Sequence, residues 1–183
     1  IDTIADGIAV KTPGELTFRI FKKYCDKVLT ATDDQISKAI FLLLQRGKLL
    51  AEPAGATAMA ACLFNEEFQK EFAGKKVVPV ISGGNINFSL IEQIIEKGMH
   101  SDYMRATIQV TTSDLPGNLV NVINTINNHK GVNFRSVIHE RSISKCPIGK
   151  AEIQITIDIM GEDQLNLICN DLKNKGYKVE VLL

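Results

Sequence analysis

The strictest hydrophobic pattern in the chain lies between residues 151 and 159. Apolar side chains alternate there with polar ones, at Ala151, Ile153, Ile155, Ile157 and Ile159. Because successive side chains of a strand point to opposite faces of its sheet, this alternation predicts a strand with one buried face. Sheets that bury only one face are normally antiparallel. The pattern therefore predicts an antiparallel sheet with helices on one side.

The residues around this strand complete the sheet. Apolar alternation also predicts strands near residues 105–110, 132–138 and 177–181, and helical spacing of apolar residues predicts helices near 119–126 and 165–172. The resulting order βαββαβ is the ferredoxin-like plan, an antiparallel sheet with two helices on one face. We place this domain at residues 103–183.

Residues 1–102 have a different pattern, made of helices and one apolar run. One helix is expected to open at Thr12–Glu15 and run to about Tyr24. A second is expected after the capping-box pair Thr32 and Gln35, and a third near Pro53. The continuous apolar run 77–81 predicts a parallel strand buried on both faces. The run ends in Ser-Gly-Gly-Asn at 82–85, and helical spacing resumes from Phe88. Such α/β units bind ligands beyond the ends of their strands, although a tight turn would also explain the glycines.

Charge and cysteine content exclude several classes of protein. Lys and Arg number 21 and balance 21 Asp and Glu, which gives no electrostatic footprint for nucleic acid or an anionic membrane. No apolar run approaches the ~20 residues of a membrane span. The four cysteines form no CxxC pair, as expected of reduced thiols in a cytoplasmic protein. No group of side chains has metal-ligand spacing, so we expect no metal site.

Four short blocks in the first half identify a family. They are TIADGIAV at 3–10, PGELT at 13–17, AEPAGA at 51–56 and SGGN at 82–85. In order and spacing they resemble the threonine dehydratases (threonine ammonia-lyases), pyridoxal-phosphate (PLP) enzymes of the tryptophan-synthase-β type. The second half resembles an ACT or ACT-like regulatory domain. The resemblance implies the C-terminal part of a fold-type II three-layer α/β domain at 1–102, followed by an ACT domain at 103–183.

The resemblance also implies a cofactor site and a reaction. Ser82 would hydrogen-bond the pyridine nitrogen of PLP, and Gly83 and Gly84, followed by Asn85, would let the ring approach the backbone. Gly7 would leave room near the ring. Asp6 and Glu52 would lie along the cofactor edge. The reaction implied is β-elimination from L-threonine to 2-oxobutanoate and ammonia, the step that leads to isoleucine biosynthesis.

Three of these residues have structural alternatives. Asp6 could be a turn or cap carboxylate. Glu52 could be an acidic residue favoured by the dipole at a helix N-terminus. Asn85 could be a helix-entry cap.

Two blocks of the family do not occur in these 183 residues. One is the Ser-x-Lys-x-Arg-Gly block that holds the Schiff-base lysine, and the other is the glycine-rich GGGGL loop that holds the phosphate. The chain also begins at Ile1 without Met. We therefore expect a fragment that forms one wall of an active site, contains no catalytic residue of its own and is inactive alone.

A loop in the second half is expected to bind an effector. Asp114, Leu115, Pro116, Gly117 and Asn118 follow the first strand of the ACT-like domain, where the family has its effector loop. Pro116 fixes φ, Gly117 permits close backbone approach, and the amides of the next helix could receive a carboxylate. A plain β-to-α turn is the alternative.

The resemblance implies small amino acids as partners. Threonine would be the substrate and isoleucine or valine the effector, bound between two ACT domains of a homo-oligomer, a dimer or a tetramer. Two other functions stay open. One is a serine or hydroxy-amino-acid dehydratase, and the other is a non-catalytic amino-acid-binding regulatory module.

Overall fold

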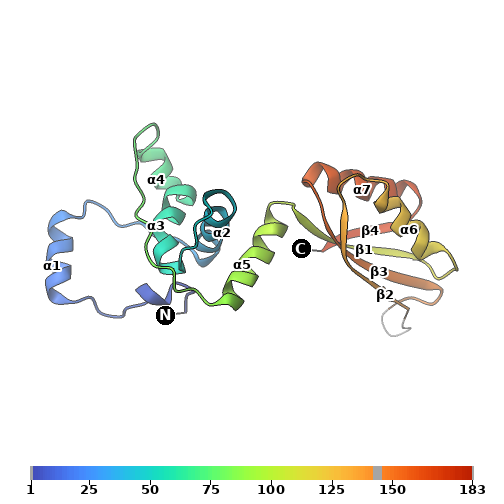
Figure 1. Ribbon diagram of the computed structural model, residues 1–183, viewed down its shortest axis with the longest axis horizontal. Coiled ribbons are helices and arrows are strands. Elements are labelled where there is room, and N and C mark those ends of the chain that lie inside the picture. The colour runs from blue at the N-terminus through green and yellow to red at the C-terminus, as the bar shows by residue number, and fades with distance from the viewer. Residues whose placement is uncertain (1, 142–145, 183) are drawn as a thin grey trace. The chain divides into compact units, whose positions relative to one another are not determined.

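The computed structural model describes residues 2–141 and 146–182. The chain divides into two compact units, Ile1–Gly98 and Met99–Leu183. Figure 1 shows the elements of both units in chain order.

The first unit consists of helices. It contains η1 (Asp6–Ile8), α1 (Glu15–Tyr24), α2 (Asp33–Leu42), a π-helical turn η2 (Leu43–Gly47), α3 (Pro53–Phe64), α4 (Glu66–Glu71) and α5 (Phe88–Ser101), the last of which ends beyond the unit. The helices predicted near 15–24, after Thr32 and near Pro53 are therefore present.

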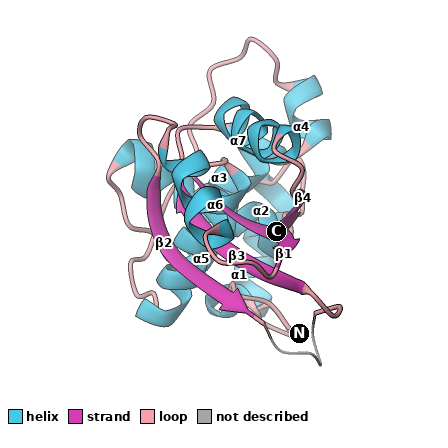
Figure 2. Cartoon of the chain, turned by 90° about the vertical axis from the view of Figure 1, so that its right-hand side faces the viewer, coloured by secondary structure: helices cyan, strands magenta, loops and turns pink. Residues whose placement is uncertain are grey.

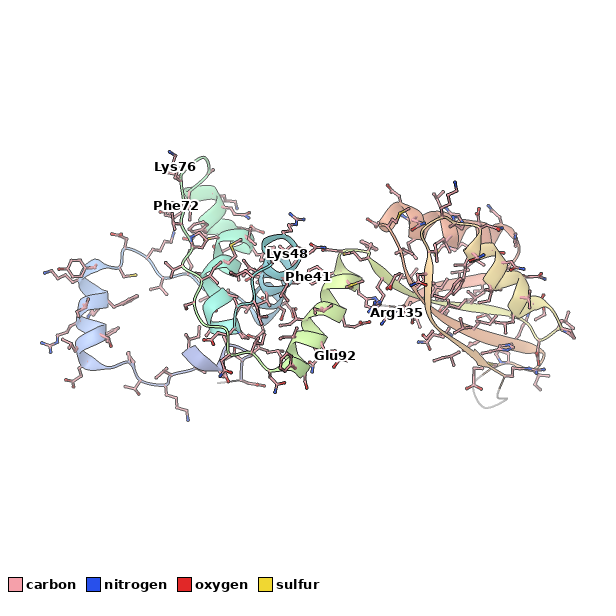
Figure 3. The ribbon with its side chains drawn as sticks, in the orientation of Figure 1. Phe41, Lys48, Phe72, Lys76, Glu92 and Arg135 are labelled. Atoms are coloured by element: carbon pink, nitrogen blue, oxygen red, sulfur yellow. The ribbon has the colours of Figure 1, made fainter. Side chains whose placement is uncertain are left out.

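The start of α2 follows from its capping box. The backbone N–H of Gln35 donates to the Thr32 hydroxyl at 3.2 Å. The backbone N–H of Thr32 donates to the side-chain oxygen of Gln35 at 2.9 Å. Beyond this cap, α2 packs against α3, and its residues Ile36 and Ile40 are buried. Gly98 of α5 lies against the ring of Phe41, which Figure 3 labels on α2. A Cβ on Gly98 would be 2.3 Å from that ring, so glycine permits this helix contact.

The strand predicted at 77–81 is not formed. Val78 and Val80 are 86% and 74% exposed, and the described part of unit 1 contains no strand to pair with them. A strand is stable only when a neighbour satisfies its backbone groups, and Pro79 provides no N–H for such a ladder. Hydrophobic content alone therefore does not make this segment a strand here.

Helix α1 also exposes apolar side chains. None of its residues is buried, and large apolar residues on it are 44–69% exposed, namely Leu16, Phe18, Ile20, Phe21 and Tyr24. Most of the apolar surface of this helix therefore faces solvent within this chain.

The second unit has the predicted ferredoxin-like order. Its elements are β1 (Arg105–Ser113), α6 (Asn118–Asn127), β2 (Asn133–Glu140), β3 (Lys150–Asp158), α7 (Glu162–Asn174) and β4 (Lys178–Leu182). The sheet order is β2-β3-β1-β4, and all neighbouring strands are antiparallel. Figure 2 shows these strands in magenta.

The alternation that predicted β3 builds the core of this unit. Ile153 and Ile155 are fully buried and lie opposite Val110 and Ile108 of β1. The same cluster includes Ile126 of α6 and residues of α7, so both helices cover this one face of the sheet. The polar residues of β3 occupy the other face, as the two-residue period requires.

Candidate functional site

The Ser82–Asn85 turn lies against the start of α3. The backbone N–H of Glu52, the residue before α3, donates to the carbonyl of Gly83 at 3.3 Å. In return, the backbone N–H of Asn85 donates to the Glu52 carboxylate at 3.2 Å. These two hydrogen bonds fix the turn on the N-terminal end of the helix, and the second one is charge-assisted.

Two glycines make this approach possible. A Cβ on Gly55 of α3 would lie 1.4 Å from the carbonyl oxygen of Ser82. Gly83 has φ +69°, and a Cβ there would lie 2.2 Å from the carboxyl carbon of Glu52. The backbone of Ser82 therefore lies directly against the backbone of Gly55, and the Glu52 carboxylate fills the space beside Gly83.

The N-terminal segment reaches the same place. A Cβ on Gly7 of η1 would be 3.1 Å from the Ala54 side chain and 3.7 Å from a Glu52 carboxylate oxygen. The segment before η1 is held by Asp33, the first residue of α2. The Thr3 hydroxyl donates to Asp33 at 2.6 Å, and the Ile4 amide donates to it at 3.2 Å. Asp33 thus sets the position of η1.

The structure places the sequence-predicted cofactor residues as follows. At the start of α3 it brings together Gly7 from the first block, Ser82, Gly83 and Asn85 from the last, and Glu52 with Gly55 from the block between them. Asp6 and Gly84 are exposed at the edges of this group. Sequence reasoning missed Asp33, whose only signal was an acidic residue directly after a capping threonine.

The contacts show what the Asn85 and Glu52 side chains do at the helix ends. At the start of α5, the side-chain oxygen of Asn87 accepts a hydrogen bond from the backbone N–H of Ser89 at 2.8 Å. Asn85 takes part through its backbone N–H instead. Glu52 is the N-cap residue of α3, but its carboxylate makes no cap hydrogen bond to that helix. Its side chain holds the turn.

The surface of this turn fits one side of a PLP site. Ser82, Gly83 and Gly84 are all exposed. The serine offers a hydroxyl that can donate to a ring nitrogen, and the two glycines leave backbone that a flat ring can approach.

The loop predicted to bind an effector borders a pocket in unit 2. This pocket has a volume of about 180 Å³ and is lined by residues 112–119, His139 and Arg141. Gly117 has φ +89° and precedes α6, and the Asn118 side chain donates to the Ser113 carbonyl at 2.9 Å. Asp114, Leu115, Pro116, Gly117 and Asn118 therefore all line one concave surface.

Arg141 lines this pocket and pairs with Asp114 of the loop. Its Nη2 donates to one oxygen of Asp114 and its Nε lies near the other, both at 2.9 Å. The hydrogen bond to Asp114, assisted by the charge of that carboxylate, raises the pKa of Arg141. Sequence reasoning missed Arg141, since only the strand pairing brings the end of β2 near this loop.

In residues 2–141 and 146–182 no group of three or more His, Cys, Asp or Glu side chains is placed to hold a metal ion. None of the described helices is long and apolar enough to cross a membrane. All four cysteines are free thiols.

Known proteins match nearly the whole chain, and a family model matches its first half. Residues 1–83 match the family described as pyridoxal-phosphate dependent enzymes. The chain is 39% identical to an L-threonine ammonia-lyase of Thermotoga maritima and 38% identical to one of Geobacter sulfurreducens, in each case over 98% of this chain and 44% of the relative. The predicted resemblance to the threonine dehydratases is confirmed.

The chain spans less than half the length of the two ammonia-lyases. An L-threonine dehydratase of Staphylococcus aureus, catabolic TdcB, is 39% identical over 98 residues, 54% of this chain. Among solved structures, a serine racemase from Dictyostelium discoideum covers 48% of this chain and 28% of its own at 44% identity, with a TM-score of 0.44. At that TM-score the structural likeness is too weak to bear on function.

Proposed function

We propose that this chain is part of a PLP-dependent threonine ammonia-lyase, which converts L-threonine to 2-oxobutanoate and ammonia. Unit 1 supplies one wall of the cofactor site, and unit 2 is an ACT-type regulatory domain. One observation carries the first assignment. The SGGN turn packs on the AEPAGA helix through Gly55 and Glu52, so that two blocks shared with the family form one surface.

Each residue of this wall has a role in the proposal. PLP, when bound, supplies an electron sink for charge that develops at the α-carbon of the substrate. Ser82 donates a hydrogen bond to the ring nitrogen without requiring that nitrogen to be protonated, whereas a carboxylate would favour protonation. Gly84, whose Cβ position has no atom nearer than 3.9 Å, leaves room for the ring, whereas Gly83 and Gly7 let the Glu52 side chain lie close to the turn and to η1. Glu52 holds the turn in place.

The remaining assignments follow the same family. Residues 1–102 belong to the catalytic domain and residues 103–183 to the regulatory domain. Compact packing divides the chain at Gly98, within α5. The lysine and the phosphate loop come from sequence outside these 183 residues, so the chain alone is inactive. The assembled enzyme is a cytoplasmic homo-oligomer that serves isoleucine biosynthesis.

The Ser82→Ala substitution in the complete enzyme tests the cofactor assignment. Loss of one neutral hydrogen bond is worth ~0.5–1.5 kcal/mol, which corresponds to a decrease in kcat of about 2- to 12-fold. The cofactor absorbance should shift while the cofactor stays bound. Ser89→Ala removes another exposed hydroxyl, on α5, and should change neither quantity. If Ser82→Ala left both kinetics and spectrum unchanged, Ser82 would not contact the ring.

The regulatory assignment rests on the pocket beside Gly117. This pocket lies wholly within unit 2, so an amino acid could bind there whether or not unit 1 is catalytic. Titration calorimetry of the 183-residue chain with isoleucine, valine and leucine tests it, and we expect isoleucine or valine to bind at millimolar concentration or below. No heat from any of the three, with the fold shown intact by circular dichroism, would leave unit 2 without an effector site.

A non-catalytic amino-acid sensor is the second candidate, and the same self-contained pocket favours it. The two candidates differ in the size of the natural polypeptide or complex. An intact-mass measurement on source material that finds a species more than twice the mass of this chain supports the enzyme. A mass near 20.2 kDa supports the sensor.

A further inference from the structure

An exposed ion pair lies on the wall of the unit 2 pocket. Asp114 immediately follows β1 and Arg141 immediately follows β2, so their contact joins the ends of two strands that are not neighbours in the sheet. The Arg141 and Asp114 side chains are 62% and 29% exposed. Exposed ion pairs are screened by water and contribute little to stability. A ligand that satisfies both charges can therefore replace this contact.

The chemistry of the pocket matches an α-amino acid. One cation and one anion lie side by side, and Leu115, Pro116 and Leu119 add apolar surface. The arginine fork binds a carboxylate through two parallel hydrogen bonds, and an aspartate accepts from an ammonium group. An α-amino acid presents both groups on one carbon, next to an apolar side chain. The volume of about 180 Å³ is below the ~300–1,000 Å³ of sites for drug-sized ligands, so a small molecule is expected.

We propose that an α-amino acid binds unit 2 by exchanging with the Asp114–Arg141 ion pair. The carboxylate of the ligand takes the place of Asp114 on Arg141, and its ammonium group takes the place of Arg141 on Asp114. The apolar side chain contacts Leu115, Pro116 and Leu119. The inference rests on the regulatory site proposed above and specifies how that site recognises its ligand.

The exchange leaves no charge without a partner. Before binding the two side chains satisfy each other, and afterwards each is satisfied by the oppositely charged end of the zwitterion. A simple anion would be attracted by Arg141 but repelled by Asp114. A simple cation would be attracted by Asp114 but repelled by Arg141. The ion pair therefore selects zwitterions over singly charged ligands, which is specificity by repulsion as well as attraction. Binding also replaces a direct link between the two strand ends with one through the ligand.

Calorimetry with three isosteric ligands tests the exchange. Isoleucine carries both charges, isoleucinamide lacks the carboxylate charge, and 2-hydroxy-3-methylpentanoate has a hydroxyl in place of the ammonium group. The wild-type 183-residue chain should bind isoleucine at least about tenfold more tightly than either analogue, because each analogue loses a charge-assisted hydrogen bond. The Arg141→Gln variant should bind isoleucine and isoleucinamide with similar affinity. The Asp114→Asn variant should bind isoleucine and the hydroxy acid with similar affinity.

Matched variants separate the exchange from a general effect of charge. Lys178 and Glu180 form another exposed ion pair, at 2.7 Å, outside the residues that line the pocket. Lys178→Gln and Glu180→Gln should bind all three ligands as the wild type does. Arg141→Lys keeps the charge but has no two-pronged fork, so its affinity for isoleucine should lie between those of the wild type and Arg141→Gln. It serves as the informative variant if Arg141→Gln does not fold.

The outcomes distinguish this inference from the function on which it rests. If the wild type binds none of the ligands, both the regulatory site and the exchange are wrong. If it binds isoleucine and the Asp114 and Arg141 variants bind all three ligands as the wild type does, the regulatory site stands and the exchange is wrong. If Arg141→Gln still binds isoleucine more tightly than isoleucinamide, other groups hold the ligand carboxylate and the stated exchange is also wrong.

Discussion

The Gly55→Ala substitution tests the contact on which the proposed cofactor wall depends. The new Cβ would lie 1.4 Å from the Ser82 carbonyl oxygen and 2.5 Å from its carbon, and both are backbone atoms that cannot rotate away. The Ser82–Asn85 turn must therefore move off α3. Overpacking of this kind costs ~1–3 kcal/mol, while alanine in place of a helical glycine gains ~0.5–1 kcal/mol. The net destabilisation of unit 1 should be about 0–2.5 kcal/mol.

The sharper effect should be on two hydrogen bonds. As the turn moves, the Asn85 amide loses the Glu52 carboxylate and the Glu52 amide loses the Gly83 carbonyl. A hydrogen bond to a charged group is worth ~1.5–3 kcal/mol, so exchange of the Asn85 amide should accelerate by roughly tenfold or more. Residue-resolved hydrogen exchange by NMR measures this directly, with α2 amides as an internal reference for overall stability.

Gly84→Ala is the matched control for this experiment. It adds the same methyl group to the same turn, but the nearest atom to its Cβ would be 3.9 Å away. Its Asn85 amide should exchange as in the wild type. If Gly55→Ala also left the Asn85 and Glu52 amides unchanged, the close packing of the turn on α3 would be wrong, and the proposed wall would lose its main support.

Three further predictions concern other parts of the chain. Glu52→Ala should accelerate exchange of the Asn85 amide by a similar factor, whereas Glu52→Gln keeps an acceptor oxygen and should have a smaller effect; equal exchange in both variants would argue against this contact. Ile155→Ala, in the fully buried core of unit 2, should lower the free energy of unfolding of that unit by ~2–5 kcal/mol in urea titrations followed by circular dichroism, and a loss under ~1 kcal/mol would contradict the packing described. Burial raises the pKa of the Cys169 thiol above its ordinary value of 9.0, because it disfavours the thiolate, and the charge of Lys173 opposes this shift more weakly. The stabilisation linked to this thiol is therefore present below pH 9.0 and lost as pH rises through the higher folded value, and alkylation of Cys169 at pH 8 should be slower than that of a free thiol; an equal rate would contradict its burial.

The local pattern of the sequence was sufficient for most of unit 2 and part of unit 1. The alternation around Ile153 and Ile155 predicts a half-buried strand because a two-residue period can satisfy only that geometry. The pair Thr32 and Gln35 predicts the start of α2 because both capping hydrogen bonds form within four residues. Such signals are complete within one element, so no knowledge of the rest of the molecule is needed to interpret them.

The apolar pattern of residues 77–81 predicts a strand, and this prediction is wrong for this chain. Its apolar residues permit a buried strand, but a strand also needs neighbouring backbone, and the described part of unit 1 offers none. Pro79 was a warning within the segment itself. Helix α1 shows the same limit, since its pattern predicts a helix correctly but does not say whether its apolar face finds a partner in this chain.

Only the tertiary structure decided which residues meet. Glu52 and Asn85 are separated by 33 positions, Thr3 and Asp33 by 30, and Asp114 and Arg141 by 27. The four family blocks marked several of these residues as important, but not that the Glu52 carboxylate holds the turn or that Arg141 pairs with Asp114. Contacts of this kind depend on how complete elements pack and on which strands are neighbours. Short-range periodicity, which reflects the geometry of one element at a time, carries no information about either.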